Sequence, residues 1–94
     1  MSWVEIDDVA HGRVVVELQP TVLEIFTSRD GGTTRIHMRM LVIDALGPNA
    51  QGNHQVRLGN GTSSTTLTVP EQWWMRLWPL LEQARAAQYP YMGY

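Results

Sequence analysis

Hydrophobic and polar residues alternate in short runs along most of the chain, and turn residues separate the runs. The runs are rich in β-branched residues, and alternation with period two is typical of strands that bury one face. They predict strands at residues 13–18, 22–28, 33–38, 40–46, 54–58 and 64–69, with the opening SWVEID at 2–7 as a candidate for a seventh. The segments between them include QP, RDGG, GPNAQGN and GNG, whose residues favour turns.

The turn segments also predict how the early strands pair. DG at 30–31 and NG at 60–61 are typical of two-residue hairpin loops, and QP at 19–20 is the predicted first turn unless its proline imposes a longer one. With these turns, both early hairpins place the same residues on one core face. The core-facing pairs are Val16 with Leu23, Val14 with Ile25, Ile25 with Ile36 and Leu23 with Met38, and the outward pairs are Phe26 with Arg35 and Glu24 with His37.

After residue 69 the hydrophobic period changes to 3.6, which predicts an amphipathic helix at about residues 70–88. The segment TVPE at 68–71 matches a capping box, in which Thr68 and Glu71 would satisfy free amides at the helix start. The inward stripe holds Trp73, Trp74, Leu77, Leu80, Leu81 and Ala84, and the outward arc holds Met75, Arg76, Pro79, Glu82 and Gln83.

The composition is that of one ordinary folded domain. With 94 residues, 44% hydrophobic and 17% charged, we expect a single domain at 1–88 and an aromatic tail at 89–94 that is either frayed or packed on the domain or a neighbour. The absence of cysteine excludes disulfides, thiolate catalysis and thiolate metal sites. The net charge of -2 argues against a nucleic-acid partner. The acidic start and the lack of a long apolar run predict a soluble, cytoplasmic protein.

These elements predict the α+β class, as a strongly bent antiparallel β-sheet or small barrel of six to seven strands capped by one C-terminal helix. The chain thereby resembles the PH-like superfold, in particular small bacterial PH-like domains. The resemblance runs from about Arg13 to Ala87, through the strand order, the hairpin VLEIFTSRDGGTTRIHM and the helix after TLTV. It implies a docking module that uses a strand edge or the groove beside the helix. It does not imply phosphoinositide binding, because the loops QPT and RDGG hold only Arg29, balanced by Asp30, where such domains cluster basic residues.

Few polar residues suggest catalysis or metal binding. His11, His37 and His54 lack the spacing of a zinc site, and the serines stand in turns and strands without the context of a catalytic nucleophile. GNGT at 59–62 precedes a strand and not a helix, so we expect a hairpin turn and no phosphate-binding loop. We therefore expect no enzymatic activity, no metal and no cofactor.

The outward face of the predicted sheet is one candidate partner site. The predicted register brings Glu24 beside His37 on this face, and Glu17 then lies near Arg39. Such a mixed-charge stripe is either a solvated face with weak ion pairs or an interface for a protein or anionic partner. The candidate partner-binding residues here are Phe26, Arg35, His37 and Arg39.

The helix supplies the second candidate. We expect Trp73 and Trp74 to lie in the core as part of the inward stripe. Trp78 falls at the border of the stripe beside Arg85 and one turn from Trp74, where it should keep an exposed edge. Trp78 and Arg85 are therefore the predicted partner-binding residues of the helix.

The leading hypothesis is a small non-enzymatic protein-interaction domain with a protein partner, which could be a second copy of the chain. The alternative is a PH-like module that binds a small molecule or lipid headgroup in a pocket at the open end of the barrel, although we do not expect membrane lipid as a partner. An enzyme is third in this ranking.

Overall fold

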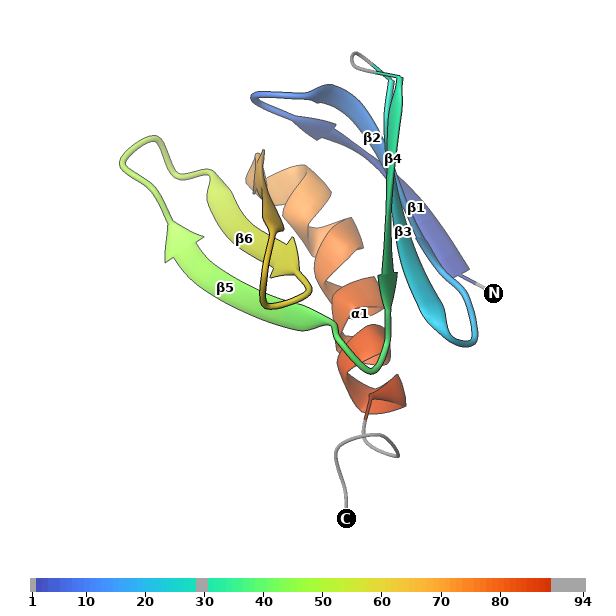
Figure 1. Ribbon diagram of the computed structural model, residues 1–94. Helices are drawn as coiled ribbons and strands as arrows, with labels where there is room; N and C mark the ends of the chain where they lie inside the picture. Colours follow the sequence, from blue (N-terminus) through green and yellow to red (C-terminus); the bar gives the residue numbers. More distant parts are fainter. Residues whose placement is uncertain (1, 29–30, 89–94) are drawn as a thin grey trace.

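The computed structural model describes residues 2–28 and 31–88 of the chain (Figure 1). The predicted turn residues 29–30 and the predicted tail at 89–94 lie outside the described residues. The elements of the described part lie close to the predicted ranges. They are β1 (Ser2–Asp8), β2 (Gly12–Leu18), β3 (Val22–Thr27), β4 (Gly32–His37), β5 (Val42–Pro48), β6 (His54–Gly59), β7 (Ser64–Val69) and α1 (Glu71–Ala87).

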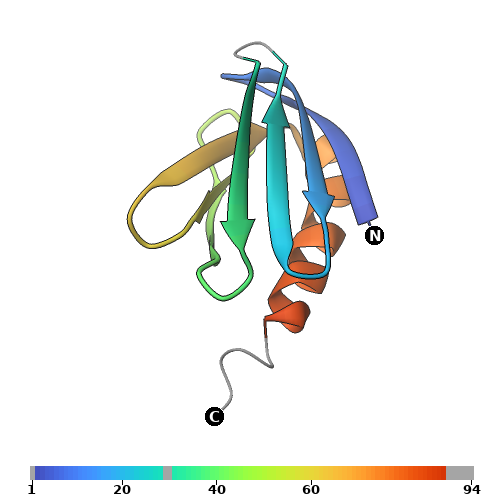
Figure 2. The same ribbon diagram turned by 45° about the vertical axis from the view of Figure 1, so that its right-hand side comes forward.

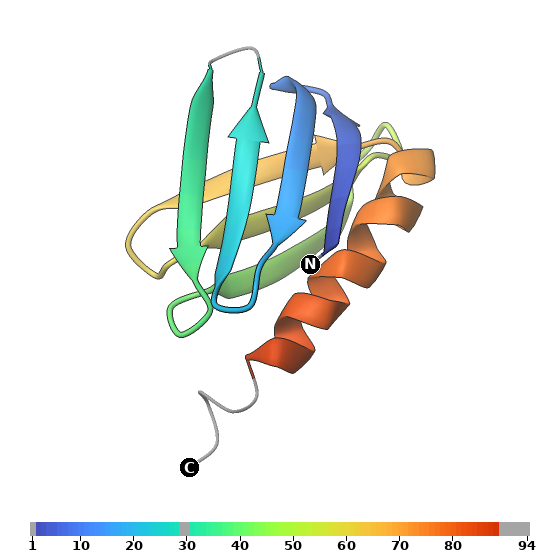
Figure 3. The same ribbon diagram turned by 90° about the vertical axis from the view of Figure 1, so that its right-hand side faces the viewer.

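The strands form two antiparallel sheets, and the helix follows the last strand. β1 to β4 make a four-stranded sheet in chain order, and β5 to β7 make a three-stranded sheet whose strands cross those of the first (Figures 2 and 3). After β4 the chain turns at residues 38–41 and enters the second sheet without pairing to β4. The α+β class is thus confirmed, but the two sheets stay separate and do not close into the barrel that was one predicted form.

The core lies between the two sheets and α1, which packs chiefly against β1 (Figure 3). Every strand except β5 contributes a fully or almost fully buried apolar side chain. On the helix, the inward stripe is buried as predicted at Leu77, Leu80, Leu81 and Ala84, while Pro79 is exposed. The buried strand residues are Ile6, Val14, Val16, Leu23, Ile25, Ile36, Val56, Leu58, Leu67 and Val69, joined by Met38 and Leu41 from the turn before β5.

Both early hairpins pair two residues out of the predicted register. In the first hairpin the amide of Gln19 donates to the carbonyl of Val22, so the central turn residues are Pro20 and Thr21 and not Gln19 and Pro20, and moving a turn by one residue moves the pairing by two. A shift of two keeps every side chain on its predicted face, so the predicted core face is confirmed. The observed pairs are Leu18 with Leu23, Val16 with Ile25 and Val14 with Thr27 in the first hairpin, and Thr27 with Gly32, Ile25 with Thr34 and Leu23 with Ile36 in the second.

The helix begins at Glu71 without the predicted capping box. Pro70 occupies the N-cap position, and no side chain hydrogen-bonds to the free amides there. Thr68 is unsuited to that role because it belongs to β7, where its hydroxyl accepts a hydrogen bond from Nε2 of Gln55 at 3.3 Å. The predicted cap is therefore wrong, and its threonine serves the sheet instead.

Candidate functional site

Four side chains stack in a row along the border between α1 and the three-stranded sheet. The imidazole of His54 lies parallel to the indole of Trp74, with ring centroids 5.0 Å apart and an interplanar angle of 2°. Trp74 stacks in turn on Trp78, at 5.1 Å and 23°. The guanidinium carbon of Arg85 lies 5.4 Å from the centroid of the Trp78 ring. We call His54, Trp74, Trp78 and Arg85 the aromatic row.

Helical spacing explains three of the four members. Trp78 follows Trp74 by four positions and Arg85 follows Trp78 by seven, so at about 100° per residue all three fall on one side of α1. The structure thus places Trp78 beside Arg85 and one turn from Trp74, as the periodicity predicted. His54 was missed by the sequence reasoning because it opens β6, and only the fold brings it to the helix.

The two tryptophans predicted to be buried lie at the margin of the core instead. Trp73 and Trp74 are half-buried, as Trp78 is, and all three pack against the core. The guanidinium carbon of Arg76 lies 5.3 Å from the Trp73 ring, and Trp74 meets His54. The first turn of α1 therefore borders polar neighbours on both sides, and full burial begins only at Leu77.

The two ends of the aromatic row lie near the two ends of β5, an edge strand that pairs only with β6 among the described strands. At one end, Nη2 of Arg85 donates a hydrogen bond to the carbonyl of Ile43 at 3.3 Å. At the other end, His54 pairs with Pro48 in the sheet while it stacks on Trp74. The helix rises about 16 Å from Trp74 to Arg85, and a strand rises about 16 Å from Ile43 to Pro48. The aromatic row and β5 therefore have similar lengths and run in opposite directions.

Apolar side chains are exposed along the same strand. Val42 and Leu46 expose 49% and 48% of their surface, and Met40 just before β5 exposes 53%. The pairing of β5 with β6 shifts between Ala45 and Gly47, which leaves Leu46 without a partner in the register. An edge strand with exposed apolar side chains is a template for a further strand, and on this edge the carbonyl of Ile43 already accepts the hydrogen bond from Arg85.

No known family model matches this chain, and no curated protein or solved structure is significantly similar to it. What the chain binds therefore has to be inferred from the chemistry of its own surfaces. Among those surfaces, the border between α1 and β5 combines stacked aromatic rings, a guanidinium and an unpaired strand edge.

The outward face of the four-stranded sheet carries the other predicted site residues. Arg35 and His37 lie on β4, and Arg39 lies in the following turn, where its amide donates to Nδ1 of His37 at 3.0 Å. Glu24 lies opposite Arg35, with the carboxylate oxygen 3.6 Å from Nε, and not beside His37 as predicted. The two-residue shift of the hairpin accounts for this error.

The same shift separates other predicted neighbours on this face. Phe26 is half-buried and lies opposite Thr33, so it does not face Arg35. Glu17, predicted near the end of β4, lies opposite Glu24, and the side-chain amide of Gln19 hydrogen-bonds to both carboxylates. Many charged side chains of this face thus already have partners within the chain, which makes the face a weaker candidate for a partner site.

The acidic residues of β1 on this face are also compensated. Nε of Arg13 donates to Asp7 at 2.9 Å, and Nη1 lies 3.0 Å from Glu5. The hydrogen bond to Asp7, followed by that to Glu5, raises the pKa of Arg13 above its usual value. Arg13 therefore stays charged and is already engaged by two carboxylates.

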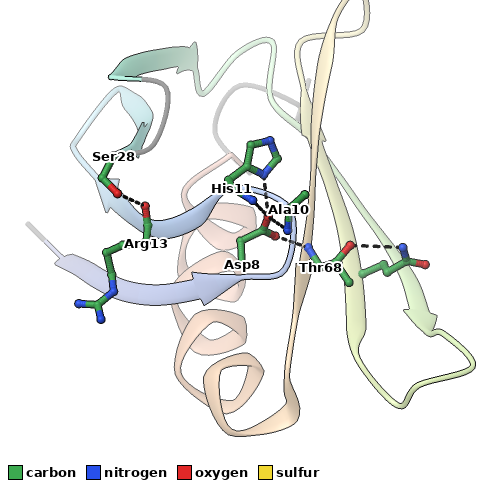
Figure 4. Close-up of polar contacts among 7 residues, drawn as sticks. Asp8, Ala10, His11, Arg13, Ser28 and Thr68 are labelled. Carbon is green, nitrogen blue, oxygen red and sulfur yellow. Dashed lines mark hydrogen bonds and ion pairs between the residues drawn. The ribbon is translucent and has the colours of Figure 1, made fainter.

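Asp8 forms a polar cluster that the sequence reasoning missed (Figure 4). Its carboxylate is fully buried and accepts hydrogen bonds from the amides of Ala10 and His11, from Nδ1 of His11 at 2.7 Å, and from the amide of Thr68. The amide of Val9 adds a bond to the Thr68 carbonyl at 2.8 Å. Asp8 thus ties the β1–β2 turn to β7 and holds the two sheets together. An aspartate at the start of a turn is the local signal that could have revealed it.

Two hollows flank the β6–β7 hairpin, with volumes of about 280 and 460 Å³. The larger hollow lies between β4 and the hairpin and is lined mainly by serine and threonine residues. Sites that bind small molecules are usually lined by apolar and aromatic side chains, which here gather at the border of α1 and β5 instead.

Within residues 2–28 and 31–88, no three metal-ligating side chains come together. The described part of the chain also contains no helix that is long and apolar enough to cross a membrane.

Proposed function

We propose that this chain is a small non-enzymatic protein-interaction domain that binds an extended segment of a partner protein between α1 and the edge of β5. The observation that carries the proposal is the aromatic row beside an unpaired strand edge. The edge of β5 offers backbone groups for strand addition, and the row offers side-chain contacts next to it.

The residue types support a protein partner. Tryptophan and arginine are enriched among the residues that carry most of the energy of protein interfaces. Trp78 is half-buried, so its position is held by the core while part of the ring is free for contact. Its two stacked neighbours, Trp74 and Arg85, restrict it further, which lowers the entropy lost on binding.

The architecture agrees with this proposal. Two antiparallel sheets of four and three strands followed by a C-terminal helix are similar to the arrangement of PH-like domains, for which docking beside the helix is expected. The charged side chains on the outward face of the first sheet already pair with one another, so this face is the second choice for the partner site.

Selection from a library of random linear peptides, followed by NMR mapping of the bound peptides, tests the proposal. We expect enriched peptides whose binding shifts the amide signals of residues 42–48 and 74–85. Trp78→Ala should weaken binding by about tenfold or more, as at other interface hot spots. The matched control is Arg76→Ala, since Arg76 is exposed and lies two positions from Trp78, about 200° around α1 and so on its far side. Peptides that map elsewhere, or equal losses in the two variants, would exclude this site.

A further inference from the structure

Arg85 is an exposed cation that the described chain does not neutralise. Its guanidinium lies over Trp78 and makes one hydrogen bond, to the carbonyl of Ile43 at 3.3 Å. None of the ion pairs among the described residues includes Arg85. The three arginines on strands behave differently, because each meets a carboxylate. These are Arg13 at 3.0 Å, Arg35 at 3.6 Å and Arg57 at 2.7 Å.

The opposite end of the aromatic row has the opposite charge. Glu71, at the start of α1, is 76% exposed and meets only His54, at 3.7 Å, among the described residues. About 21 Å of helix separate Glu71 from Arg85, which is more than the screening length at physiological salt. Glu71 and Arg85 therefore place opposite charges at the two ends of the aromatic row.

We infer that the bound segment carries an aspartate or glutamate that meets Arg85, two positions from an apolar residue that packs on Trp78. This rests on the proposed function and adds the chemistry of the partner to it. A guanidinium stacked on an indole keeps its N–H donors at its edge, where a carboxylate can accept two hydrogen bonds in one plane. Such a bond to a charged group is about twice as strong as one between neutral groups.

The spacing follows from the distance within the row. The guanidinium carbon of Arg85 lies 5.4 Å from the Trp78 centroid. Residues two positions apart on an added strand lie about 6.6 Å apart and point to the same face, whereas neighbouring residues point to opposite faces. An apolar residue and an acidic residue at positions i and i+2 therefore fit the pair, in either order along the segment.

The charge at the far end restricts how the segment lies. A carboxylate is attracted at the Arg85 end and repelled at the Glu71 end, so the acidic residue selects one direction of the segment along β5. A basic residue about six positions away, toward Glu71 and on the same face of the segment, would strengthen the same orientation.

Parallel selections from the same random peptide library test this inference. The domains compared are the unaltered chain, Arg85→Glu, and the control Arg76→Glu, whose arginine stacks on Trp73 at 5.3 Å on another side of the helix. We expect the unaltered chain and Arg76→Glu to enrich an acidic residue two positions from an apolar one. Arg85→Glu should enrich lysine or arginine at that position and should bind the peptides of the unaltered chain about tenfold more weakly or worse.

The outcomes separate the inference from the proposed function. One outcome is that the peptides map to residues 42–48 and 74–85 but show no charge preference, and another is that Arg85→Glu still selects the acidic residue. Either outcome overturns the inference but is consistent with the proposed docking site. An empty selection, or peptides that map elsewhere on the domain, overturns both. Thermal unfolding of each variant checks that the exposed substitutions leave the fold intact.

Discussion

Asp8→Ala should lower the free energy of unfolding by about 3 kcal/mol, because it removes a buried acceptor of four hydrogen bonds. The amides of Ala10 and His11 lie in a surface turn, where water can replace the carboxylate, so each bond contributes about 0.5–1 kcal/mol. The amide of Thr68 lies at the junction of the two sheets, and leaving it without an acceptor costs about 1–3 kcal/mol.

Urea denaturation followed by tryptophan fluorescence measures this loss. The midpoint should fall while the slope of free energy against urea stays constant, as expected when stability changes and the denatured state does not. Asp7→Ala is the matched control, since Asp7 is 48% exposed and makes only a surface ion pair with Arg13, worth less than about 1 kcal/mol. A loss below about 1 kcal/mol for Asp8→Ala, or one equal to that of Asp7→Ala, would refute the role of Asp8 as the link between the sheets.

Three further substitutions and one control have expected results. Leu77→Ala, in a fully buried site on α1, should cost about 2–5 kcal/mol in urea denaturation, and Met75→Ala on the exposed face should stay within about 0.5 kcal/mol. Gly59→Ala should lower the thermal midpoint by several degrees, because the new Cβ would lie 2.8 Å from Cβ of Ser64, and an unchanged midpoint would contradict this. Trp78→Ala should reduce peptide binding measured by calorimetry much more than it reduces the thermal midpoint, since its ring is only half-buried.

The elements and their buried faces could be predicted because both depend on local pattern. Alternation in β2 and β3 placed Val16 and Ile25 inward, and the 3.6-residue period of α1 placed Leu77 and Leu81 inward. Burial of one face constrains a strand only to within two residues, since a shift of two preserves every face. The pairing therefore depended on where the turn lies, and the first turn is centred on Pro20 and Thr21, one residue later than predicted.

Contacts between distant segments account for what the sequence did not show. The capping box failed because Thr68 is still part of β7, where Gln55 and Asp8 use its hydroxyl and its amide. A capping-box motif predicts that the threonine hydroxyl and the glutamate carboxylate can bond to the first amides of the helix. That prediction fails where the tertiary structure gives the threonine other hydrogen-bond partners. The hydrogen bond from the Thr68 amide also explains the role of Asp8. Its local sequence is typical of a turn residue, yet its carboxylate links two sheets that are far apart in sequence.

The candidate site likewise combines contacts that are local in sequence with contacts between distant segments. Trp78 and Arg85 could be paired from helical spacing alone, which is why the sequence indicated them as partner-binding residues. Their neighbours His54 and Ile43 belong to the second sheet, and only the tertiary structure brings them to the helix. The local pair supplies an aromatic surface and a charge, whereas the strand edge supplies the direction in which a partner can lie. Of the proposed docking site, Trp78 and Arg85 could therefore be predicted from the sequence, whereas His54 and the edge of β5 could not.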